Sequence, residues 1–184
     1  MKADYNVLLD ACVIANIGVC DLYLRLAEQP RLYLPRWSEE ILSEVSSTHK
    51  KLGWQNDLAE YFQHEIRRAF PEALISGYEQ LTPIMTNHEK DRHVLAAAVK
   101  DGIDLIITFN LRHFRSEDLS KWNVRAEHPQ NYLLTLYSIN PAIVLAKLTM
   151  IAQKKGLTLP DLLINLGKSV PEFSAKVLED SGYS

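Results

Sequence analysis

Three acidic side chains lie at positions that a folded chain would turn inward. Asp10 ends the mostly apolar run from Tyr5 to Leu9, which predicts a buried strand, and open α/β sheets place their active sites at the carboxyl ends of such strands. Glu44 lies beside the apolar stripe of a predicted helix, beyond its first turn. Asp91 precedes Val94 by three residues and therefore shares the inward face of another predicted helix. An inward charge is costly unless a partner offsets it, so the three acids are candidates for one functional site.

Each acid also has an explanation in local structure alone. Asp10 can cap the helix that is predicted directly after it, because Asp is a favoured N-cap residue. Asp91 can interact with the dipole of its own helix or pair with Arg92. Glu44 is less easily explained in this way because it lies beyond the first helical turn. Spacing alone does not show that the three acids meet.

If the acids do meet, a divalent cation is the partner that best offsets their mutual repulsion. Hard oxygen ligands suit Mg²⁺ or Mn²⁺. Such an ion activates water and holds the oxygens of a phosphodiester during in-line attack. The acids therefore suggest a metal centre that cleaves phosphodiesters.

The histidines and cysteines do not form a recognised zinc pattern. His88, His93 and His113 lack zinc-site spacing, and both cysteines are remote from them in sequence. We expect these histidines at the surface or in support of the acids. Two cysteines make no disulfide framework, so we interpret Cys12 and Cys20 as small buried hydrophobic residues.

The elements that would position the acids alternate between strands and helices. Apolar runs of strand length are separated by longer segments with helical periodicity, and this order is typical of a parallel sheet covered by helices. From residue 129 onward the pattern is wholly helical, with Gly and Pro between the helices. Predicted strands cover residues 5–9, 32–34 and 105–108; predicted helices cover 19–29, 38–45, 54–70, 88–100, 131–137, 141–155, 159–166 and 171–179; residues 71–81 form a further helix or turn.

Composition excludes several classes of protein. The chain has 184 residues, 47% of them hydrophobic, which is enough for one compact domain and a small annex. No apolar run approaches the ~20 residues that span a bilayer, and Asp4 lies where a signal peptide would begin its apolar region, so we expect a cytoplasmic protein that does not enter membranes. The net charge of −3 is not that of a protein that coats nucleic acid, although it allows a nuclease with an acidic metal site.

Four segments of the chain resemble motifs of the PIN domain, a metal-dependent ribonuclease fold related to the flap-endonuclease nucleases. They occur in the order found in that family and cover about residues 4–125. They are most similar to bacterial PIN toxins of the VapC type, some of which have a similar helical tail. The segments are LLDACVI at residues 8–14, PRWSEEILSEV at 35–45, DRHVLAAA at 91–98 and ITFNLRHF at 107–114.

The resemblance implies an α/β fold in three layers, with a central parallel sheet flanked by helices. Residues 1–139 would form the PIN-like nuclease domain, and residues 140–184 would form a helical C-terminal extension. The implied activity is that of a metal-dependent endoribonuclease, the toxin of a type II toxin–antitoxin pair, which hydrolyses RNA with a metal-activated water. The implied partners are the RNA substrate, a cognate antitoxin protein and a second copy of the chain in a homodimer.

The resemblance also assigns the acids. Asp10, Glu44 and Asp91 match the first three acids of the family's metal site and would bind Mg²⁺ or Mn²⁺. Glu40 takes the place of Glu44 if the register of that helix is one turn off. Because the family's nucleases act through these acids, we expect them to be the catalytic residues.

The fourth position departs from the family. Many PIN nucleases have an acid where this chain has Asn110, whose carbonyl oxygen can ligate a metal or hold a metal-bound water but adds no negative charge. Thr108 is a candidate to orient a ligand or a phosphate. The departure leaves open a second function, a catalytically weak PIN domain that binds RNA or protein.

Two other classes are disfavoured by the residues after the first predicted strand. A phosphatase of the haloacid dehalogenase type needs a second Asp two residues after the first, where this chain has Cys12. A nucleotide-binding Rossmann domain needs a Gly-rich loop after its first strand, and no such loop follows Asp10.

Overall fold

A five-stranded parallel sheet forms the centre of the computed structural model, which describes residues 4–183. Residues 1–3 lie outside the described residues. They precede Asp4, the acid that led us to expect no signal peptide. The strand order is β3-β2-β1-β4-β5, and every neighbouring pair is parallel. The predicted α/β class, a parallel sheet covered by helices, is confirmed. The strands are β1 (Asn6–Leu9), β2 (Leu34–Ser38), β3 (Leu74–Ile75), β4 (Leu105–Ile107) and β5 (Arg125–Glu127).

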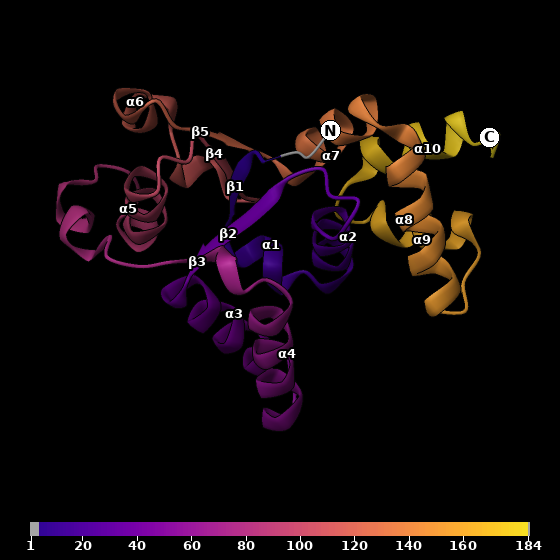
Figure 1. The fold of residues 1–184 in the computed structure, drawn as a ribbon, viewed down its shortest axis with the longest axis horizontal. Helices are drawn as coiled ribbons and strands as arrows, with labels where there is room; N and C mark the ends of the chain where they lie inside the picture. Colours follow the sequence, from indigo (N-terminus) through magenta and orange to yellow (C-terminus); the bar gives the residue numbers. More distant parts are fainter. Residues whose placement is uncertain (1–3, 184) are drawn as a thin grey trace.

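Helices flank the sheet on both sides (Figure 1). In this view α5 and α6 lie on one side, α8, α9 and α10 gather on the other, and α3 and α4 project together from below the sheet. No single helix within residues 4–183 is long and apolar enough to cross a membrane, although α7 and α8, bent by 118°, pass that test as a pair. The helices are α1 (Ala11–Ala15), α2 (Ile17–Ala27), α3 (Glu39–Lys51), α4 (Asn56–Ala69), α5 (Arg92–Lys100), α6 (Ser116–Leu119), α7 (Pro129–Ile139), α8 (Pro141–Lys154), α9 (Leu159–Leu166) and α10 (Pro171–Asp180).

Strand β1 lies at the middle of the sheet, between β2 and β4. Val7, Leu8 and Leu9 are fully buried, as expected for a central parallel strand that is covered on both faces. Leu8 pairs with Arg36 of β2 on one side and with Ile106 of β4 on the other. The run that predicted a buried strand therefore forms the central strand of the sheet.

The second strand differs from its predicted position. The apolar run at 32–34 predicted a strand that Pro35 would end, but β2 begins at Leu34 and continues through Pro35. The proline fits because the neighbouring strand β3 pairs only with Trp37 and Ser38, so no hydrogen bond to β3 is lost at Pro35. Strands β3 and β5 were not predicted, because β3 has only two residues and β5, with the sequence RAE, lacks the apolar run that indicated the equally short β4.

The helix predicted over 88–100 begins later than expected. Residues Glu89–Asp91 form a short 3-10 helix, η3, and α5 itself begins at Arg92. Gly102 follows the helix with a φ of +66°, the left-handed conformation expected of a glycine that ends a helix. Asp91 is therefore the residue that leads into α5 and lies at its N-terminal end.

The C-terminal helices pack against the rest of the chain through α2. The Nζ atom of Lys147 in α8 donates to the backbone carbonyls of Glu28 and Gln29, at 3.4 and 3.2 Å. Leu148 and Phe173 are fully buried and belong to a hydrophobic core that is continuous with the core around the sheet. We therefore propose that residues 140–184, although an extension in sequence, unfold together with residues 1–139.

Replacing Leu148 with Ala tests this proposal. All three tryptophans lie in residues 1–139, so tryptophan fluorescence reports unfolding of the sheet layer and not of α8. Removal of a fully buried leucine side chain costs about 2–5 kcal/mol of unfolding free energy. We expect the fluorescence and far-ultraviolet circular dichroism transitions of Leu148→Ala to shift down together by several degrees. An unchanged fluorescence midpoint, with earlier loss of helical signal, would show that the extension unfolds independently.

Candidate metal centre

A cavity of about 760 Å³ lies at the carboxyl edge of the sheet, where residues that follow β1 and β4 line it. The strand order reverses between these two strands, because the chain builds outward from β1 to β2 and β3 before β4 adds to the other side. Open α/β sheets bind ligands at this kind of switch point. The predicted site residues that line the cavity are Asp10, Glu40, Glu44, Asp91 and Asn110.

The parallel topology explains why four distant segments converge. Asp10 follows β1 directly, and Asn110 follows β4 shortly after its end. Helix α3 begins immediately after β2, and its cap Ser38 accepts a hydrogen bond from the backbone N–H of Ile41 at 3.2 Å. Helix α5 precedes β4 and must run back against the strand direction, so Asp91 at its beginning reaches the same edge.

Asp10 is almost completely buried, with 2% of its surface exposed. Its carboxylate accepts hydrogen bonds from the Ala11 backbone (2.7 Å), the Thr108 hydroxyl (2.6 Å) and the Cys12 thiol (3.1 Å). Burial raises the pKa of Asp10 despite the bonds from Thr108 and Cys12, and the charge of Asp91 adds to the rise. Asp10 is thus the N-cap of α1, as the structural explanation predicted, and also a wall of the cavity.

Thr108 lies behind Asp10 and is fully buried. Its hydroxyl donates to Asp10 and accepts from the backbone N–H of Asn110 at 2.9 Å, so it links the ends of β1 and β4. With this burial Thr108 orients the carboxylate of Asp10 and has no access to a phosphate.

The interpretation of Cys12 as a small buried hydrophobic residue is wrong. Its side chain is half-buried, its thiol donates to Asp10, and its sulfur accepts from the backbone N–H of Phe109 at 3.3 Å. Burial and the charge of Asp10 raise the pKa of the thiol to about 12, so the proton that makes this hydrogen bond stays in place at neutral pH. The signal in the sequence was its position two residues after Asp10. Cys20 is buried, as expected.

His93 lies between the two glutamates of α3. Its Nε2 atom is 3.2 Å from Oε1 of Glu44, and its Nδ1 atom is 3.7 Å from Oε2 of Glu40. Burial opposes a positive charge on His93, but the hydrogen bond to Glu44 and the charges of Glu44 and Glu40 outweigh it, and the pKa is raised. The glutamates are one helical turn apart and both line the cavity, so the structure brings both into the site. The sequence feature that could have indicated this contact with the glutamates was the position of His93 within the run of buried residues in α5.

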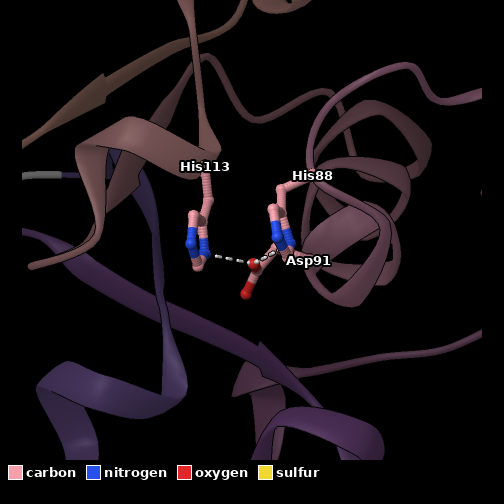
Figure 2. A group of neighbouring side chains, drawn as sticks. All are labelled: His88, Asp91 and His113. Carbon is pink, nitrogen blue, oxygen red and sulfur yellow. Dashed lines mark hydrogen bonds and ion pairs between the residues drawn. The ribbon is translucent and has the colours of Figure 1, made fainter.

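Asp91 interacts with two histidines, which Figure 2 shows on either side of its carboxylate. The Nδ1 atom of His113 lies 2.7 Å from Oδ2 of Asp91, and the Nδ1 atom of His88 lies 3.5 Å from the same oxygen. The side chain of Asp91 is 12% exposed and that of His113 is 18% exposed, whereas His88 is 44% exposed. His113, from the short helix η4 (Leu111–His113), therefore makes the closer and more buried contact.

His88, Asp91 and His113 bring three ligand atoms within 4.8 Å of one another, which is the spacing of a metal site. The two imidazole rings, however, are stacked with centroids 3.9 Å apart and planes only 12° from parallel. The lone pair of a ring nitrogen lies in the plane of its ring, so two stacked rings cannot both direct a lone pair at one ion. This geometry favours hydrogen bonding to Asp91, the supporting role expected for these histidines.

The residues that face the cavity provide oxygen donors. Asp10, Glu40, Glu44 and Asp91 offer carboxylates, and Asn110 offers an amide. Mg²⁺ and Mn²⁺ prefer such hard oxygen ligands. The repulsion that a cation would relieve is present, because the charge of Asp91 adds to burial in raising the pKa of Asp10. The donor set therefore fits a hard divalent cation.

One curated protein provides a comparison. The chain is 39% identical over 107 residues to a protein of Mycobacterium tuberculosis (strain ATCC 25618 / H37Rv) named "Putative ribonuclease VapC50". The aligned region covers 56% of this chain and 63% of that protein, which is less than two thirds of its length. No protein-family model and no solved structure matches the chain. The similarity supports the resemblance to VapC-type PIN ribonucleases that the four motifs indicate.

The raised pKa of Asp10 leads to a prediction for the metal-free protein. A carboxyl whose folded-state pKa is raised disfavours the folded state once it ionises, so its charge costs stability at neutral pH and the cost disappears below about pH 4. Asn removes the charge but has one accepting oxygen in place of two, so the variant also loses a hydrogen bond from Ala11, Thr108 or Cys12 at every pH. We therefore expect the melting temperature of Asp10→Asn in chelator to rise, relative to that of the wild-type protein, by a few degrees between about pH 4 and pH 7, because only the wild-type carboxyl ionises over this range.

The matched control is Asp57→Asn, because the Asp57 carboxylate also accepts a hydrogen bond from the backbone N–H of the next residue but is exposed on α4. This control should leave the melting temperature almost unchanged. The gain for Asp10→Asn should shrink as the pH falls. A difference between the variant and the wild-type protein that does not change with pH would contradict a costly charge at Asp10.

Proposed function

We propose that this chain is a metal-dependent endoribonuclease that hydrolyses RNA phosphodiesters. The observation that carries the proposal is the convergence of Asp10, Glu44, Asp91 and Asn110, from four separate segments, on one cavity at the switch point of the sheet. The similarity to a protein named as a ribonuclease supports the same reaction class. Both lines of support are independent of composition and net charge.

Asp10, Glu44 and Asp91 would hold Mg²⁺ or Mn²⁺, with the amide oxygen of Asn110 in assistance. When bound, such an ion supplies an activated water and offsets the negative charge that develops on the phosphodiester. The chain itself keeps each acid in place through a separate donor. Thr108 and Cys12 bind Asp10, as the distances above show.

The other two acids are held in the same way. His93 donates to Glu44, and His113 donates to Asp91. These donors limit the movement of the carboxylates, so the site needs little reorganisation when it receives its ligand. Glu40 faces the same histidine as Glu44 and is the alternative glutamate for the metal.

We also propose that the nuclease acts as the toxin of a type II toxin–antitoxin pair in the cytoplasm. The support is the printed VapC name of the similar protein and the four motifs of the VapC type. A cognate antitoxin that covers the site in the resting cell would then be the protein partner, and a second copy of the chain would form a homodimer. The RNA that is cut is a substrate whose sequence the cavity residues do not specify.

Substitution of the three acids tests the nuclease proposal. Asp10→Asn, Glu44→Gln and Asp91→Asn should each reduce cleavage of single-stranded RNA in Mg²⁺ by about a hundredfold or more, and double variants should be little worse because the acids act as one unit. The measurement is a single-turnover cleavage rate, with far-ultraviolet circular dichroism to confirm folding. The same substitution at Asp91 should relieve growth arrest on expression.

Two results would contradict these proposals separately. Cleavage by Asp10→Asn at the wild-type rate in Mg²⁺ would remove the acid from the metal centre. Normal growth of cells that contain abundant folded wild-type protein would argue against a toxin but not against a nuclease.

A second candidate function is a catalytically weak PIN domain that binds RNA or protein, and Asn110 is the observation that favours it. With Glu40 as the alternative to Glu44, the metal would have three carboxylate ligands, which hold one divalent ion well and a second ion poorly. Asn110 lines the cavity without adding a negative charge. Its backbone N–H is anchored to Thr108, so a substitution of the side chain leaves that anchor in place.

Asn110→Asp tests whether the missing charge at this position weakens the metal centre, because the substitution changes almost no volume and adds one charge beside the acids. We expect the Mg²⁺ concentration for half-maximal cleavage to fall by roughly twofold to tenfold, and the melting temperature in chelator to fall because one more acid then lacks a counter-ion. The measurement pairs a cleavage-versus-metal curve with melting curves. If neither curve moves, Asn110 serves only as the cap of η4 and takes no part in the metal centre.

A further inference from the structure

The cavity has a second half that the metal centre does not use. Beyond the acids, its wall is formed by helix α3 and by the turn between α1 and α2. The α3 residues of this half carry hydroxyls and one ammonium, and no carboxylate among the described lining residues lies beyond Glu44 along α3. The α3 residues are Ser43, Ser47, Thr48 and Lys51, which we call the α3 track.

We propose that the α3 track binds the phosphate backbone of single-stranded RNA next to the bond that is cleaved. The proposal rests on the nuclease function proposed above. It assigns the direction in which the substrate strand leaves the metal centre, and it assigns Lys51 and Ser47 as binding residues. The occupant is identified by its chemistry, because hydroxyls and ammonium groups are the side chains that contact phosphates.

The spacing of the track matches an extended strand. Ser43, Ser47 and Lys51 are four residues apart and therefore share one face of α3. From Ser43 to Lys51 this face is about 12 Å long, since a helix rises 1.5 Å per residue. That length extends the contact beyond the single phosphodiester that the acids can hold.

The charges along the cavity also suit a polyanion that enters from this end. Glu40 and Glu44 repel a phosphate unless a cation lies between, whereas Lys51 attracts one. Ser47 and Thr48 separate the two regions with neutral groups. The Ser47 hydroxyl donates to the backbone carbonyl of Ser43 at 3.0 Å, so it would turn away from that carbonyl to contact a phosphate. The strand would therefore meet favourable charge first and the acids last.

Leu52 adds an apolar contact at the open end of the groove. It lines the same cavity, directly after Lys51, and is 68% exposed. A large exposed side chain beside a phosphate-binding lysine offers a surface for the adjoining base. Such a contact is indifferent to base identity, so the track would bind RNA without a strong sequence preference.

The helix supplies controls for two of the track residues, Lys51 and Ser47. Lys50 precedes Lys51 in the same last turn and does not line the cavity, and Ser46 precedes Ser47 in the same way. Charge reversal at Lys50 or Lys51 changes net charge and the interaction with the helix dipole equally. Any difference between the members of a pair therefore reports the groove and not the helix.

The test measures binding of a fluorescent single-stranded RNA of about 12 nucleotides by anisotropy, in Mg²⁺ and in the Asp10→Asn background so that cleavage does not interfere. We expect Lys51→Glu to weaken binding about tenfold and Lys50→Glu less than about twofold, with the same contrast between Ser47→Asp and Ser46→Asp. Lys51→Ala should reduce the slope of log affinity against log salt by about 0.7, the value for one phosphate contact on a single strand.

Equal loss of RNA affinity for the two variants of each pair would overturn the proposal. It would also be overturned if Lys51→Glu lost binding to a co-expressed protein partner while its RNA affinity stayed unchanged. The result of this binding test can be separated from the result of the nuclease test. Selective loss of RNA binding in Lys51→Glu, with no cleavage by the wild-type protein, would support the track and contradict the nuclease proposal. Cleavage by the wild-type protein with no selective loss would do the reverse.

Discussion

The burial of one carboxylate, that of Asp10, is the constraint on which the site depends. The central strand β1 delivers this acid to the switch point, where 2% of it remains exposed. A buried charge destabilises a fold unless donors surround it, and Thr108, Cys12 and the Ala11 backbone provide them. The same three bonds also join the end of β1 to the end of β4 and the start of α1. A local solution to a buried charge thus helps to hold the two central strands in register.

The other acids follow the same principle with a different partner. Histidines, which can donate from either nitrogen, pair with Glu44 and with Asp91. These partners come from different elements than the acids they bind, so each pair also ties one segment of the site to another. The cavity therefore contains separately supported carboxylates, and these donors offset part of the repulsion between them.

Much of this arrangement could be read from the sequence, because it depends on strand ends and helix starts. The run before Asp10, the Ser38 cap and the inward register of Asp91 each have a periodic or capping signal, and all three are present in the structure. The short strands β3 and β5 and the true limits of β2 could not be read, since β3 has only two residues, β5 lacks an apolar run and Pro35 is tolerated only because β3 is short.

Contacts between distant segments were the other part that could not be predicted. The thiol of Cys12 and the ring of His93 act through residues that only the fold brings near, so their local sequence gave an apolar or supporting interpretation at best. Glu40 and Glu44 are a related case. They are one turn apart, so they share a helix face, and His93 lies between them. Register reasoning cannot choose between two residues that the structure places on the same side of the same cavity.

The separation of charge inside the cavity explains how an acidic chain could handle a polyanion. A net charge of −3 gives no general attraction for RNA, and the acid end of the cavity repels it. Productive binding then requires two local sources of positive charge, a cation held by the acids and Lys51 at the far end of α3. The substrate would reach the acids only when the cation is in place. If the proposed metal and RNA sites are correct, an acidic centre beside a neutral and then basic wall would favour RNA binding to the metal-loaded protein, a property that net charge alone would not suggest.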